Sequence, residues 1–125
     1  MAHQTFRAGV GRAQITPAMT VPHAGWGAQT HILPDGVEAD LWTTVLVVAD
    51  GAEMAAYVDL DLVIVSRAES DAIRAAVGET LGIPASAVRV SVTHNHAGPP
   101  PSSWDWVKQG AGALQRYYEQ LPDQS

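Results

Sequence analysis

Cysteine is absent from this chain of 125 residues, and so are long apolar runs and clusters of basic residues. Without cysteine there are no disulfides and no thiolate ligands, so any metal must be held by His, Asp, Glu or Tyr side chains. The net charge is −6 and no Lys/Arg patch is present, so we expect no nucleic-acid partner. No apolar stretch approaches the ~18 residues that a transmembrane segment needs.

The first residues also lack the apolar segment of a signal peptide. We therefore expect a cytoplasmic protein, or a secreted one whose signal has been removed. Hydrophobic residues make up 46% of the chain, which is enough to bury one core. We expect residues 1–125 to form a single domain or the N-terminal fragment of a larger one.

The order of β-rich and helical patterns predicts an α/β fold. Residues 43–65 are predicted to form an antiparallel hairpin, because two β-rich runs flank Asp50 and Gly51, the preferred central pair of a type I′ turn. A helix is expected over residues 66–82, where Ser66 and Glu69 form a capping box.

A strand at the start of residues 88–101 follows that helix. A strand, helix and strand in succession imply a crossover that leaves the last strand parallel to the one before the helix. Together with the hairpin this predicts a mixed sheet. Residues 17–36 read as a long loop, of the kind that is uncommon unless functional. A further helix is predicted over residues 104–120, weakened by Gly110 and Gly112.

The most informative pattern lies at the end of the last strand, where His94 and His96 precede Gly98 and three prolines. Side chains two positions apart on extended backbone point to the same side, and these positions lie roughly 7 Å apart. Neutral imidazole is a good zinc ligand, and a second imidazole can bind the same ion, orient a substrate or transfer protons. An ordinary loop with two surface histidines also fits this short spacing. We expect Gly98 to adopt a backbone conformation closed to other residues, or to allow a close backbone approach.

Five segments, which follow one another along the chain in the same order as in the family, resemble the neutral or alkaline (non-lysosomal) ceramidase family. Residues 93–99 (Thr-His-Asn-His-Ala-Gly-Pro) resemble its Thr-His-Thr-His-Ser-Gly-Pro, and residues 8–17 resemble its opening Gly-x-Gly-x-x-Asp-Ile-Thr. Residues 24–27 resemble its Met-x-Gly-Tyr-Gly, 40–46 its Asp-Leu-Tyr-Ala-Arg-Ala-Leu, and 58–62 its Val-Ser-Leu-Asp-Leu. This chain departs from the pattern at Gln14, where the family has Asp, and at Asn95, where it has Thr. The resemblance covers only the N-terminal portion of the family's catalytic domain.

The resemblance implies zinc-dependent hydrolysis of an N-acyl amide, such as that of a ceramide-like sphingolipid. It makes His94 a zinc ligand and His96 a catalytic residue that contacts the substrate or the metal-bound water. The family's other ligands, a second His, a Glu and a Tyr, lie beyond residue 125. A complete site is therefore expected to need the missing remainder of the domain or a self-associating partner chain.

Several other residues are candidates for the site. Asp61 is a candidate hydrogen-bond acceptor for a ligand histidine, although it and Asp59 also fit simple solvent-facing or turn-capping roles. His23 and His31 lie in the long loop, which the resemblance places near the site. Four tryptophans are candidates for an acyl-chain groove, although core positions are more common for such residues: Trp26, Trp42, Trp104 and Trp106.

Two other function classes stay open. One is a different metal-dependent hydrolase, since Thr-His-x-His also opens the metallo-β-lactamase pattern; that pattern continues with Asp where this chain has Gly98. The other is a non-catalytic binding or assembly domain that keeps the fold without the ligands.

Overall fold

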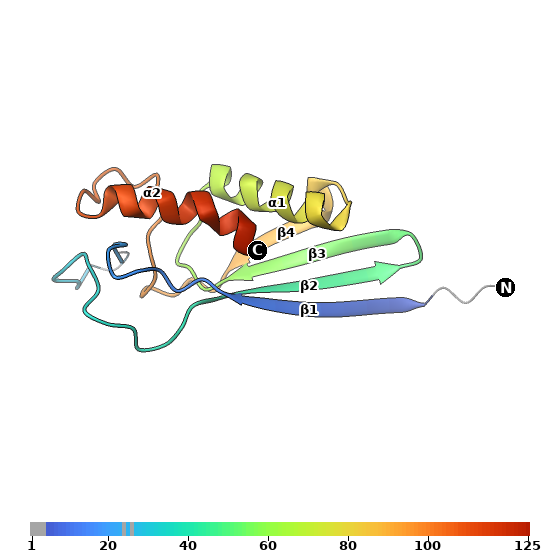
Figure 1. The fold of residues 1–125 in the computed structure, drawn as a ribbon, viewed down its shortest axis with the longest axis horizontal. Helices are drawn as coiled ribbons and strands as arrows, with labels where there is room; N and C mark the ends of the chain where they lie inside the picture. The colour runs from blue at the N-terminus through green and yellow to red at the C-terminus, as the bar shows by residue number, and fades with distance from the viewer. Residues whose placement is uncertain (1–4, 24, 26) are drawn as a thin grey trace.

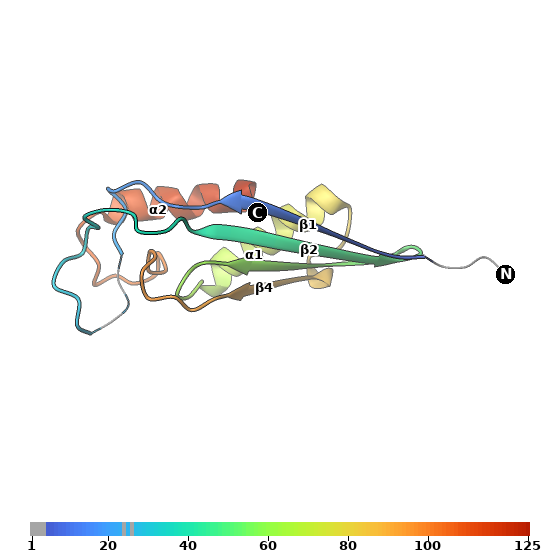
Figure 2. The same cartoon turned by 90° about the horizontal axis from the view of Figure 1, so that it is seen from below.

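The computed structural model describes residues 5–23, 25 and 27–125. Its strands form one sheet in the order β1-β2-β3-β4, in which the first three are antiparallel and β4 is parallel to β3. Both helices lie on the same face of this sheet (Figures 1 and 2). The elements are β1 (Phe6–Gln14), β2 (Trp42–Asp50), β3 (Glu53–Leu60), α1 (Arg67–Leu81), β4 (Val88–Val92) and α2 (Ala111–Gln120). The predicted α/β fold, with a hairpin followed by a strand-helix-strand crossover, is confirmed.

The hairpin between β2 and β3 turns one residue later than predicted. Asp50 pairs with Glu53, so the central residues of the turn are Gly51 and Ala52. Gly51 has a φ of 60° and Ala52 has no positive φ, whereas a type I′ turn needs positive φ at both central positions. The prediction of a type I′ turn at Asp50-Gly51 is therefore wrong, and glycine at the first central position fits a type II′ turn.

Strand β3 ends at Leu60, five residues before the predicted end at Val65. The strand ends there because its partner β2 begins at Trp42. Beyond that point β2 has no further residues with which β3 could pair. The backbone N–H of Asp61 donates to the Trp42 carbonyl, and the chain then turns toward α1. Residues 61–65 thus form a loop beside the end of the sheet.

Helix α1 begins and ends where the sequence predicts. Ser66 is the N-cap, and its hydroxyl accepts from the Glu69 N–H while the Glu69 carboxylate accepts from the Ser66 N–H. Gly82 ends the helix with a φ of 68°. The face of α1 that carries Ile73 and Val77 is buried against the sheet.

The prediction for the second helix is wrong at its start. Residues 104–110 form turns, and α2 begins only at Ala111. Gly110 has a φ of 75°, and a Cβ there would lie 2.7 Å from the Thr20 carbonyl oxygen. Gly110 therefore marks a close contact between the helix start and the loop of residues 17–36.

Strand β1 has no counterpart among the predicted elements. It is exposed along nearly its whole length, so it lacks the alternation of buried and exposed side chains by which strands are recognised. The fully buried core lies between the helices and the other strands, and includes Leu60, Leu62, Ile73 and Leu121. Among the described residues, no helix has the length and hydrophobicity to cross a membrane.

Candidate functional site

His94 and His96 lie directly after β4, at the end of the sheet where β3 also terminates. The backbone N–H of Thr93 donates to the Leu60 carbonyl and that of His94 to the Leu62 carbonyl, so the loops that follow these strands stay side by side. His94 has a φ of 60°, so this segment is not the extended backbone assumed from the sequence. The left-handed turn still brings the two imidazoles together, with ring centroids 4.8 Å apart and planes at 88°.

Each of these two rings is held by a backbone carbonyl through Nδ1. His94 Nδ1 lies 2.7 Å from the Val63 oxygen, and His96 Nδ1 lies 2.6 Å from the Gly25 oxygen. A carbonyl only accepts, so Nδ1 is the protonated nitrogen that donates, and Nε2 keeps its lone pair in the neutral ring. Metal-binding histidines are commonly oriented in this way.

The carbonyl that holds His96 comes from the long loop of residues 17–36. Gly25 has a φ of 137°, a conformation that L side chains rarely adopt. The Gln29 side chain orders the loop, because it accepts from the Gly25 N–H and donates to the carbonyls of His23 and His31. The segment 24–27 of the family resemblance thus contributes through Gly25, while Ala24 and Trp26 lie outside the described residues.

Asn95 fixes the backbone between the histidines and the prolines. Its Oδ1 accepts from the N–H groups of Ala97 at 3.1 Å and Gly98 at 3.0 Å. Its side chain lines a cavity that neither His94 nor His96 lines, and it organises the loop that carries them. This role of Asn95 was missed, although Asn is a common turn-forming residue.

The prediction for Gly98 is half confirmed. Its φ is not positive, so the first alternative, a backbone conformation closed to other residues, is wrong. The backbone approach is close, because a Cβ at Gly98 would lie 3.2 Å from Leu41 Cδ1 and 3.4 Å from the Asp61 carbonyl oxygen. A side chain at this position would require Leu41 Cδ1 to move by a few tenths of an ångström.

Asp59, in β3, and Asp61, directly after it, both accept hydrogen bonds at the end of the sheet. Asp61 Oδ2 accepts from the Trp42 N–H at 2.9 Å. Asp59 Oδ1 accepts from the Ser91 hydroxyl at 2.9 Å. The carbonyls of Val63 and Gly25, and not the Asp61 carboxylate, hold the two imidazole rings.

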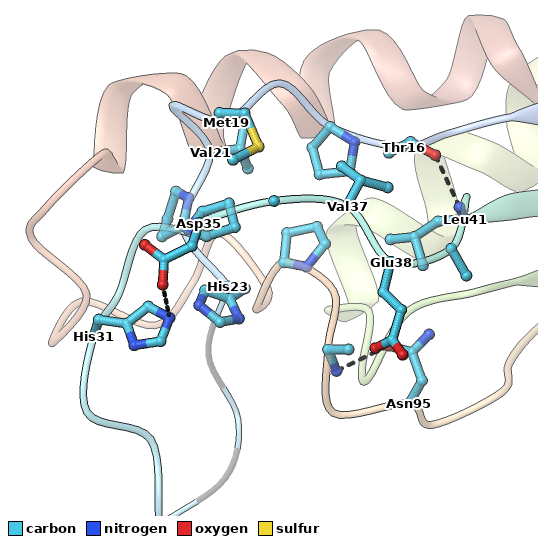
Figure 3. A pocket seen from close by; sticks show the side chains of 17 residues that line it. Thr16, Met19, Val21, His23, His31, Asp35, Val37, Glu38, Leu41 and Asn95 are labelled. Carbon is cyan, nitrogen blue, oxygen red and sulfur yellow. Dashed lines mark hydrogen bonds and ion pairs between the residues drawn. The ribbon is translucent and has the colours of Figure 1, made fainter.

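His23 and His31 form a separate pair, with ring centroids 5.1 Å apart. They line a cavity of about 600 Å³ that His94 and His96 do not line (Figure 3). Burial, with a smaller effect of the neighbouring His31, holds the pKa of His23 below its usual value. The long loop therefore reaches the candidate site through Gly25 and not through its histidines.

Two of the candidate tryptophans lie beside the loop that holds His96. Trp104 and Trp106 have ring centroids 5.5 Å apart and line a cavity of about 310 Å³ together with Gly25, Gly27 and Gln29. Trp42 is instead covered by the Arg12 guanidinium, 4.5 Å from its ring centroid. The assignment of an acyl-chain groove stays a prediction.

The described residues do not by themselves provide a full set of metal ligands. No group of three or more His, Cys, Asp or Glu side chains is placed to hold an ion within residues 5–23, 25 and 27–125. Zinc sites normally use three or four protein ligands. His94 and His96 therefore fit part of such a site.

Comparison with known proteins identifies a related fold. No model of a protein family matches the chain, and no curated protein matches it by sequence. The fold is similar to that of neutral ceramidase from Pseudomonas aeruginosa, with a TM-score of 0.72 and 19% identity over 98% of this chain and 21% of that one. A ceramidase complexed with C2 is similar too, with a TM-score of 0.69 and 19% identity over 92% of this chain and 20% of that one. The chain thus has the fold of a segment that makes up about one fifth of each of these ceramidases.

Proposed function

We propose that this chain supplies the His94 and His96 part of the active site of a zinc-dependent hydrolase that cleaves N-acyl amides of the ceramide type. The observation that carries the proposal is the pair of imidazoles with both Nδ1 atoms bonded to backbone carbonyls. The fold shared with ceramidases and the segments that resemble that family support the same activity. The proposed site is completed by residues outside these 125, from a longer parent chain or a partner chain.

The two histidines have different roles in this proposal. His94 would hold the metal through Nε2, with its ring fixed by the Val63 carbonyl. When bound, zinc lowers the pKa of its water to about 7 and polarises a carbonyl oxygen. His96, fixed by the Gly25 carbonyl, would contact the substrate or exchange a proton at Nε2.

Zinc uptake by the chain as it stands tests the assignment of His94. We expect weak but measurable binding in equilibrium dialysis, and a loss of tenfold or more in affinity in His94→Ala. His31→Ala, which removes an exposed imidazole outside the site, is the matched control and should bind zinc as the unmodified chain does. Unchanged zinc binding in His94→Ala would show that the assignment is wrong.

His96 is tested in a chain or complex that has the full ligand set. His96→Ala should retain zinc and lose about 10²-fold or more in turnover of a fluorogenic ceramide, the scale for removal of a positioned proton-transfer group. Loss of metal and activity together would instead make His96 a ligand. A full-length parent that binds no zinc would favour the alternative of a non-catalytic binding or assembly domain.

A further inference from the structure

The cavity of about 600 Å³ lies between the loop of residues 17–36 and the backbone that follows β4. Its walls are mostly apolar, with Val21, Val37 and Leu41 among the side chains that line it (Figure 3). A cavity of this size is in the range of small-molecule sites. Because neither His94 nor His96 lines it, the cavity is distinct from the candidate metal site.

The charged side chains that line this cavity are all acidic. They are Asp35 and Glu38, and no Lys or Arg lines the cavity. Figure 3 shows the two acids toward opposite ends, Asp35 beside His31 and Glu38 beside Asn95. Asp35 Oδ2 lies 3.6 Å from His31 Nε2, whereas Glu38 forms no ion pair with any described residue. The Glu38 end therefore offers an uncompensated negative charge beside an apolar wall.

His23 gives the wall near Asp35 a polar atom without a partner. Its Nε2 is buried and has no hydrogen bond among the described residues. Burial lowers the pKa of His23, so this ring is neutral at pH 7 and does not repel a cation.

We propose that this cavity binds an aliphatic amine, with its apolar chain along Val21, Val37 and Leu41 and its ammonium group at Glu38. The apolar wall would contact the alkyl chain of the amine. The negative charges that line the cavity favour a cation over an anion. The proposal does not depend on the metal site.

Calorimetric titration of the 125-residue chain at pH 7.5 compares octylamine, octanol and octanoate, which differ in the charge of the head group. Octylamine should bind most tightly, octanol about fivefold more weakly because a solvent-exposed ion pair is lost, and octanoate more weakly again. Hexylamine should bind about tenfold more weakly than octylamine because two methylene groups fewer are buried. Equal binding of the three octyl compounds, preference for octanoate, or no binding of octylamine would overturn the proposal.

Three variants at the cavity locate the ligand. Glu38→Gln should reduce the affinity for octylamine to that for octanol and leave octanol binding unchanged, whereas the matched variant Asp35→Asn should change neither. Ala39→Phe, at an exposed position that lines the cavity, should weaken binding of both ligands. An effect of Asp35→Asn without an effect of Glu38→Gln, or full binding by a folded Ala39→Phe chain, would contradict the assigned site.

Discussion

His94 combines an unusual backbone conformation with a fixed side chain. Among the described residues other than glycine, it alone has a positive φ. Such a conformation costs on the order of 1–3 kcal/mol and often marks a functional position. The sequence predicted that His94 and His96 lie together, because His-x-His follows a clear strand pattern. It could not predict the φ of His94 or the carbonyls of Val63 and Gly25, because backbone acceptors far apart in sequence leave no residue-type signal.

Substitution of Asn95 tests how the loop that carries His94 and His96 is held in place. Asn95→Ala should reduce the free energy of unfolding by about 1–3 kcal/mol, because the buried N–H of Gly98 and that of Ala97 lose their acceptor. Asn95→Asp should keep most of this stability, since a carboxylate oxygen accepts from both groups. Urea unfolding at pH 7.5 measures both variants. Equal stability of Asn95→Ala and the unmodified chain would refute this role.

His23 makes the stability of the chain depend on pH. Its pKa in the folded chain is below its usual value near 6.5, mainly because of burial, so the unfolded chain binds more protons at this residue. The contribution of His23 to stability is therefore present above pH 6.5 and is lost as the pH falls through the folded pKa. In His23→Gln, the free energy of unfolding should fall less between pH 7.5 and pH 5 than in the unmodified chain. The same fall in both proteins would contradict the prediction.

At the scale of elements, two glycines near the start of α2 should respond in opposite ways to alanine. Gly110→Ala should destabilise the chain by more than about 1 kcal/mol, because φ is positive and the new Cβ would meet the Thr20 carbonyl at 2.7 Å. Gly112→Ala, inside the helix, should stabilise it by up to about 1 kcal/mol, since the nearest atom is Arg116 Nη1 at 3.5 Å. Thermal unfolding compares the two. If Gly110→Ala stabilised the chain, this would contradict the close contact between the start of α2 and the loop of residues 17–36.

The elements that the sequence predicted well carry local signals. Helix α1 has a capping box and a glycine stop, and both are formed by residues adjacent to the helix. Strand β1 and the end of β3 depend instead on partners, since β1 is an exposed edge and β3 stops where β2 begins. The start of α2 was predicted too early because Gly110 was treated as a weak helical residue, whereas its neighbour in space, Thr20, lies in a distant loop.

For the whole molecule, the sheet face opposite the helices remains open. A cross-strand row on this face contains Val10, Leu46 and Tyr57, which are 69%, 37% and 46% exposed. Together with the unpaired edge of β1, such a face favours association in water. In size-exclusion chromatography with light scattering, we expect the chain to self-associate with rising concentration.

Charge on the open face should reduce this association. The double variant Val10→Lys and Leu46→Lys should shift the chain toward the monomer, whereas Val37→Lys, at an exposed loop position away from the sheet, should not. A monomeric unmodified chain at high concentration would contradict the expectation. The sequence could not predict the complete proposed site, because His94 and His96 mark one part of it and no pattern within these 125 residues marks further ligands.

The central claim is that His94 and His96 present free Nε2 atoms for a metal site. Two-bond ¹⁵N–¹H correlation spectra of the imidazoles at pH 8 test it directly, first without metal and then during titration with Zn²⁺. We expect both rings in the form protonated at Nδ1, and a Zn²⁺-dependent shift of His94 Nε2 that is retained in His31→Ala. Rings protonated at Nε2, or a Zn²⁺ response at His23 and His31 with none at His94, would contradict the claim.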